Sequence, residues 1–70
     1  MTGAEFREIR LGLGLTQTGF GRVLGYGGKD GTMQKHVSQL ESGARPVPEA
    51  VGRLAAMLGR YGVPEDFFEI

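Results

Sequence analysis

Apolar residues recur every three or four positions through most of the chain, the spacing that gathers them on one face of an α-helix. The stretch from 33 to 42 shows this most clearly, because apolar side chains follow each other at spacings of four and three from Met33 to Leu40. Thr32 can cap the free amides of the first turn, and Gly43 can take the left-handed conformation that ends many helices. The pattern therefore predicts a helix over residues 33–42.

Two further helices are predicted before this one. Residues 3–12 follow a capping box, in which the Thr2 hydroxyl and the Glu5 carboxylate each satisfy a free backbone amide. Residues 17–24 carry a shorter apolar stripe. Gly21 within that stripe is a weak helix former, and a glycine inside a helix can mark a place where another helix crosses closely. We therefore expect the second and third helices to pack tightly at this residue.

The rest of the chain predicts a fourth helix and a terminal turn. Pro48 suits the first turn of a helix, and the apolar stripe that follows it runs to about residue 61. Residues 63–70 can form one last short turn, with acids in its first part as the helix dipole prefers. No stretch alternates as a strand would, and no repeat is visible. The sequence thus predicts a single all-α domain over residues 1–70.

One exposed face of the predicted helix at 33–42 carries an unusual set of polar side chains, namely Gln34, Lys35, Ser38 and Gln39. Amides and amines are long donors and acceptors, and glutamine can make paired hydrogen bonds to adenine. The face is either an ordinary solvated surface or a surface that reads nucleic acid.

Charge and composition narrow the function only slightly. The net charge is zero, but residues 6–60 hold all eight lysines and arginines against four carboxylates. The last ten residues hold three acids and no base. A mildly basic body with an acidic tail is compatible with a nucleic-acid partner.

Several classes of protein are disfavoured. No cysteine is present and His36 is the single histidine, so we expect neither a metal nor another cofactor. A lone histidine without paired acids on one helical face offers little for catalysis, so we do not expect an enzyme. No apolar run approaches the ~20 residues of a membrane span. The acidic start does not read as a secretory signal, so the expected location is the cytoplasm.

The order of short motifs resembles the Cro and phage-repressor type of helix-turn-helix protein, the XRE family. The matching segments are RLGLGLTQ at 10–17, FG at 20–21, LG at 24–25, VSQLESG at 37–43 and RPVP at 45–48. The resemblance implies a compact bundle of four to five helices of the lambda-repressor-like type. It also implies a regulator, phage or bacterial, that binds double-stranded DNA, most simply a repressor on a near-palindromic operator.

The resemblance also implies roles for individual residues. The base-reading positions of the family correspond to Gln34, Lys35 and Gln39. The positions expected to contact the DNA backbone are Thr16, Gln17, Lys29, Ser38, Ser42 and Arg45. The family normally joins its second and third helices with three or four residues, whereas residues 26–31 form an enlarged loop here. This loop either bulges outward or re-aims the recognition helix, and Lys29 within it either contacts phosphate or is simply solvated.

Arg10 stands out because it lies on the otherwise apolar stripe of the first predicted helix. A guanidinium in such a place needs a carboxylate, since an unpaired buried charge is very costly. The resemblance suggests Glu41 as the partner, in a structural ion pair.

The chain end carries three large apolar side chains, Phe67, Phe68 and Ile70, where chain ends are usually polar and frayed. They either form a dimerisation tail within 61–70 or fold back onto the monomer's own core. A homodimer would present two recognition helices. Alternatively, the protein is an interaction module on the same fold, such as the antitoxin of a toxin pair or a phage adaptor.

Overall fold

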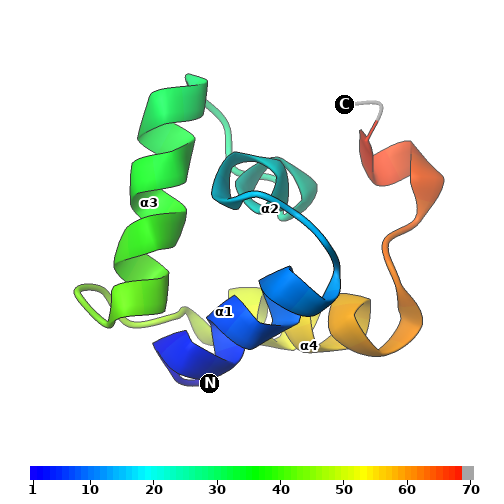
Figure 1. The fold of residues 1–70 in the computed structure, drawn as a ribbon, viewed down its shortest axis with the longest axis horizontal. Helices are drawn as coiled ribbons and strands as arrows, with labels where there is room; N and C mark the ends of the chain where they lie inside the picture. The colour runs from blue at the N-terminus through cyan, green and yellow to red at the C-terminus, as the bar shows by residue number, and fades with distance from the viewer. Residues whose placement is uncertain (69–70) are drawn as a thin grey trace.

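The structure, a computed structural model, describes residues 1–68 and is all-helical over that range (Figure 1). The elements are α1 (Gly3–Gly12), α2 (Gln17–Val23), α3 (Asp30–Ser42), α4 (Glu49–Tyr61) and a 3₁₀ turn, η1 (Glu65–Phe68). The predicted all-α class is therefore confirmed. Ile70, the last residue of the predicted tail, lies outside the described residues.

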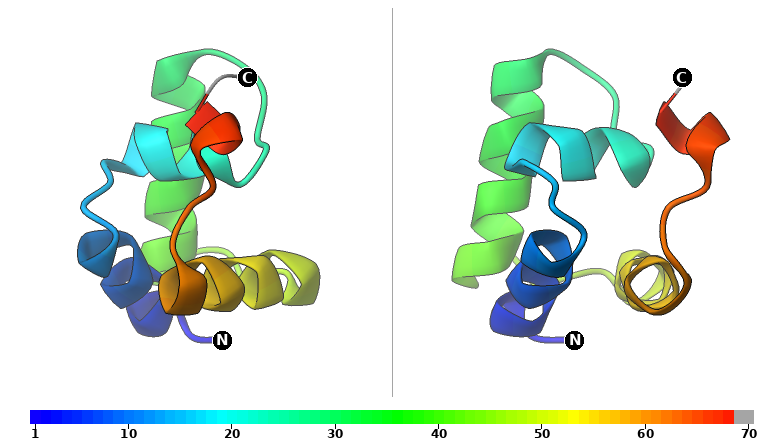
Figure 2. Two further views of the ribbon diagram at one scale, coloured as in Figure 1. Left: turned by 90° about the vertical axis from the view of Figure 1, so that its right-hand side faces the viewer. Right: turned by 45° about the vertical axis from the view of Figure 1, so that its right-hand side comes forward.

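The helices enclose one small core. Helix α3 packs against both α1 and α2, and α4 packs against α1. Figure 2 shows α2 lying between α3 on one side and η1 on the other, and η1 contacts α2. The outer side of α3 is thus left uncovered along the length of the helix (Figures 1 and 2).

Helix α1 begins at the predicted capping box. The Thr2 hydroxyl accepts a hydrogen bond from the Glu5 amide at 3.1 Å, and a Glu5 carboxylate oxygen accepts one from the Thr2 amide at 2.9 Å. The hydrogen bond from the Thr2 backbone lowers the pKa of the Glu5 carboxyl below its ordinary value, and the Thr2 side chain contributes a smaller effect in the same direction. The capping box fixes the residue at which α1 begins. Phe6, one residue after Glu5, is the buried residue of this helix.

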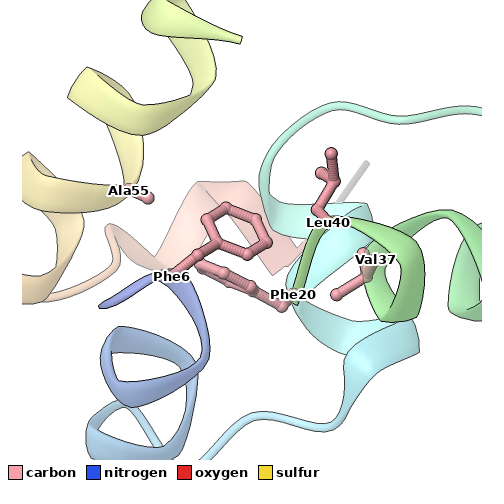
Figure 3. Close-up of a cluster of buried hydrophobic side chains, with 5 residues drawn as sticks. All are labelled: Phe6, Phe20, Val37, Leu40 and Ala55. Atoms are coloured by element: carbon pink, nitrogen blue, oxygen red, sulfur yellow. The ribbon is translucent and has the colours of Figure 1, made fainter. Parts of the chain in front are cut away.

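The core is built from one or two side chains of each long helix (Figure 3). Its members are Phe6, Phe20, Val37, Leu40 and Ala55. The rings of Phe6 and Phe20 lie 4.9 Å apart between centroids and are tilted by 44°, an arrangement favoured by their quadrupoles. These two aromatic residues join α1 to α2, and both helices then bury the inner stripe of α3.

Helices α2 and α3 approach each other closely at Gly21. A Cβ atom built at this position would lie 2.5 Å from Cγ of Met33 and 3.2 Å from Cγ2 of Val37. The predicted tight packing is therefore confirmed. Glycine at position 21 lowers the helix propensity of α2, but a larger residue there would push α2 and α3 apart.

Helix α3 starts three residues earlier than predicted. It begins at Asp30, and Lys29 occupies the cap position without a side-chain hydrogen bond. The predicted start at 33 and the predicted cap at Thr32 are wrong. Asp30 lies in the first turn, where a carboxylate suits the helix dipole, and it also pairs with Arg22 at 2.6 Å. Gly43 ends the helix in the left-handed conformation, as predicted.

The connection between α2 and α3 consequently covers residues 24–29 rather than 26–31. It does not simply bulge outward, because Tyr26 is half-buried against the core. The Tyr26 ring meets the His36 ring edge-on at 4.4 Å between centroids.

Candidate functional site

The uncovered side of α3 carries the polar residues singled out in the sequence. Its inner stripe is buried through Met33, Val37 and Leu40. At 100° per residue, Lys35 then lies near the centre of the outer face, with Ser38 and Gln34 toward one edge and Gln39 toward the other. The predicted base-reading residues therefore share the outer side of one helix. Lys35 and Gln34 are exposed, and Gln39 is half-buried.

A shallow polar hollow borders each edge of this face. The hollow beside the Gln34 edge is lined by Arg7, Arg10, Thr16, Gln17, Thr18 and Gln34. The hollow beside the Gln39 edge is lined by Thr32, Lys35, His36, Gln39 and Arg45. No carboxylate lines either one, and each contains at least one arginine. The face of α3 is thus a ridge between two hollows that suit an anionic ligand.

Arg10, which lines the first hollow, forms an ion pair with Glu41. Arg10 Nε donates to Glu41 Oε2 at 2.6 Å, and Nη2 donates to Oε1 at 3.2 Å. The remaining Nη1 donates to the Leu15 carbonyl at 2.9 Å. The Arg10 and Glu41 side chains are only 12% and 5% exposed. The arginine on the apolar stripe therefore has the partner that the resemblance suggested.

The ion pair extends outward to the surface of α3 through two glutamines. Gln17 Nε2 donates to Glu41 Oε1 at 3.2 Å, and Gln34 Nε2 donates to Gln17 Oε1 at 3.1 Å. The direction follows from the chemistry: an ionised carboxylate only accepts, so Gln17 must offer it the amino group and keep its oxygen for Gln34. Sequence reasoning placed both glutamines in a DNA contact and missed this connection, because no local pattern links positions 17, 34 and 41.

The second hollow is held by the connection before α3 and the segment after it. His36 packs against Tyr26, whose phenol has a pKa raised above its ordinary value by burial. The Arg45 amide donates to the Gln39 carbonyl at 3.2 Å, which keeps Arg45 beside the end of α3. The packing of His36 was also missed from the sequence, since Tyr26 was assigned to a loop with no predicted contacts.

Charge divides between the two sides of the molecule. Lys35 and Arg45 pair with no carboxylate of residues 1–68, and the two acids of α3, Asp30 and Glu41, pair with Arg22 and Arg10. Glu65 and Asp66 belong to η1, on the far side of α2 from α3 (Figure 2). A zero net charge thus conceals a cationic face around α3.

Other predicted positions have simpler surroundings. Thr16 caps α2 by accepting from the Gly19 amide at 3.0 Å. The Ser42 hydroxyl bonds to the Gln39 carbonyl at 3.3 Å, and Lys29 is exposed at the start of α3. In the tail, Phe67 is half-buried and Phe68 is exposed.

The chain matches no protein-family model, no curated protein and no solved structure. The function must therefore be inferred from the chemistry of the side chains on the outer face of α3. Within residues 1–68, no three or more histidine or acidic side chains lie together where they could hold a metal ion. In the same part of the chain, every helix is too short or too polar to cross a bilayer.

Proposed function

We propose that the protein binds double-stranded DNA by placing α3 in the major groove, and that it regulates transcription in this way. The observation that carries the proposal is the outer face of α3, where Gln34, Lys35 and Gln39 stand between two hollows that contain cations and no carboxylate. Amide and amine side chains on an exposed helix suit base edges. Cations beside the helix suit the phosphates on either side of the groove.

The packing of α2 on α3 supports a helix-turn-helix arrangement. The close approach at Gly21 fixes α2 across the inner side of α3, so the amino end of α2 comes beside the Gln34 edge. There Thr16, Gln17 and Arg7 could contact one phosphate backbone, while Arg45 and Ser42 could contact the other. The connection between the two helices is longer than is usual in XRE-type proteins, which the sequence resembles. The packed Tyr26 limits how far this connection can re-aim α3.

The regulatory outcome follows from occupancy alone. The proposed mechanism has no covalent step: backbone contacts set the register, base contacts select the sequence, and the bound protein blocks or recruits polymerase. A homodimer would read two half-sites about one helical turn apart, ~34–36 Å, and so select a near-palindrome.

The direct experiment is selection of DNA from a random duplex library by the purified protein, followed by affinity measurement on the selected site. We expect a selected consensus and a dissociation constant that rises steeply with salt, because phosphate contacts release counterions. Equal, weak binding to all sequences, or no binding at low salt, would contradict the proposal.

Replacing Lys35 or Gln39 with alanine should weaken binding to the selected site by about 1–3 kcal/mol and relax preference at one base pair, because a base contact is lost. Arg45→Ala should weaken all sequences similarly and reduce the salt slope by about one. Arg53→Ala is the matched control, since Arg53 is an exposed cation of α4, outside the α3 face. If none of the three α3-side variants differs from this control, α3 is not the reading helix.

A protein-interaction module remains the second candidate, such as an antitoxin or a phage adaptor. It is favoured by the exposure of three large apolar side chains outside the α3 face, Met57, Tyr61 and Phe68. The library selection separates the two, since an interaction module without a DNA role would yield no consensus.

A further inference from the structure

Helices α1 and α4 pack against each other at the lower end of the view in Figure 1, and an open groove follows their contact. The groove encloses about 670 Å³, within the ~300–1,000 Å³ of typical ligand pockets. It is lined chiefly by Ile9, Gly12, Ala56 and Gly59 and by two carboxylates, Glu5 and Glu8. No residue of α3 lines it, so this α1–α4 groove is separate from the proposed DNA-binding face.

The groove exists because α4 presents only small residues on its side. Gly59 must be small, since a Cβ atom there would lie 3.0 Å from Cγ2 of Ile9. Close packing does not explain Gly12 on the opposite wall, because a Cβ atom at that position would meet nothing within 4 Å. Ala56 is exposed as well. The space beside Gly12 and Ala56 is therefore mostly apolar and is not filled by residues 1–68.

The charge of the groove is opposite to that of the hollows beside α3. Glu5 and Glu8 line it, and no lysine or arginine does. Neither carboxylate forms an ion pair with a cation of residues 1–68, the Met1 amino group included. Arg7, which lies between them in the sequence, instead lines a hollow beside α3. The α1–α4 groove thus disfavours phosphate and suits an apolar ligand that carries positive charge.

The shape of the site is elongated. A smaller depression adjoins the groove, and the two share Met1 and Ala56. Its two charged residues, Glu49 and Arg53, pair with each other at 2.6 Å, so they leave the acidic balance of the site unchanged. From Glu49 to Gly59 the two depressions follow α4 for about 15 Å, at 1.5 Å per residue. An open trough of this length matches a rod-shaped ligand better than a compact one.

We propose that the α1–α4 groove binds an amphipathic helix of a partner protein, one whose apolar face is flanked by lysine or arginine. The apolar side chains of that helix would replace water over Ile9 and Ala56, and its cations would face Glu5 and Glu8. A helix that lays its apolar face in a hydrophobic groove, with anchors three and four residues apart, is a recurring mode of peptide recognition. The contact does not depend on the proposed DNA binding. Because α3 stays open, the protein would hold DNA and the partner helix together.

Selection of short peptides from a random displayed library against the full chain, followed by titration of the enriched peptides, tests the groove. We expect enriched sequences with apolar residues three and four apart and lysine or arginine beside them. Ala56→Phe should fill the groove and raise the dissociation constant of these peptides at least tenfold. Ala50→Phe is the matched control, because Ala50 is also an exposed alanine of α4 but lines neither depression. Circular dichroism melts verify that both variants remain folded.

A charge reversal tests the polarity of the groove. Glu8→Lys should weaken the enriched peptides at least tenfold, whereas Glu65→Lys, the same charge change on the exposed surface of η1, should have little effect. Failure to enrich any peptide would overturn the proposal, as would enriched peptides that lack lysine and arginine or that bind the Ala56→Phe variant normally. Equal effects of the two charge reversals would also overturn it. Peptide binding without a DNA consensus would contradict only the proposed DNA function.

Discussion

Replacing Arg10 with methionine should lower the free energy of unfolding by about 3–5 kcal/mol, since it leaves a buried carboxylate without its counter-ion. Glu41 is only 5% exposed and receives two hydrogen bonds from Arg10. Methionine fills similar space but donates nothing, and the Leu15 carbonyl also loses its donor. A domain of this size has little more stability than that in total, so the melting temperature should fall sharply.

Thermal or urea unfolding measures this loss, with Arg53→Met as the matched control. Arg53 is also an arginine of an ion pair with a glutamate, at the same 2.6 Å distance, but its pair is exposed. The control should change stability by no more than about 1 kcal/mol. Equal small effects of the two substitutions would show that the Arg10 pair does not hold α1 and α3 together.

The second large effect is expected at Gly3, where alanine should destabilise the fold by about 2–3 kcal/mol. Alanine normally stabilises a helix relative to glycine. Here, however, a Cβ atom would lie 2.5 Å from the carbonyl oxygens of both Leu40 and Glu41. Those are backbone atoms in the last turn of α3 and cannot rotate away, so α1 would have to move.

Gly12→Ala provides the control within the same helix. A Cβ atom at Gly12 meets nothing within 4 Å, so this substitution should be neutral or stabilise by up to about 1 kcal/mol. Chemical unfolding of the two single variants distinguishes crowding from propensity. If Gly3→Ala also stabilises, α1 does not rest on the end of α3 as described.

The sequence predicted the number and kind of helices, because caps and apolar spacing are local properties. The capping box at Thr2 and the glycine end at Gly43 were both found this way. The start of α3 was predicted three residues late, because the glycines around Asp30 resemble loop. The earlier start is stabilised by the Asp30 carboxylate in the first turn of α3 and by its ion pair with Arg22 of α2, a contact that the local sequence does not show.

The candidate site was predictable only in part, for a similar reason. Helical spacing was enough to place Gln34, Lys35 and Gln39 outward. It could not reveal that Gln34 is tied to Gln17, because that bond depends on how α2 crosses α3. The close crossing of α2 and α3 occurs at Gly21. The sequence alone does not show that Met33 and Val37 are the residues packed against this glycine.

The hydrogen-bonded chain from Arg10 through Glu41 and Gln17 to Gln34 has a consequence for how such a protein could change over evolutionary time. Each member satisfies the next, so the effect of altering one depends on what the others are, and the four substitutions should be strongly non-additive. A substitution of Gln34 would remove the hydrogen bond that holds the Gln17 side chain, and a Gln17 side chain that then moved away would leave Glu41 with one donor fewer. Divergence at these positions would therefore be concerted, whereas Lys35, which shares none of these bonds, is free to vary by itself.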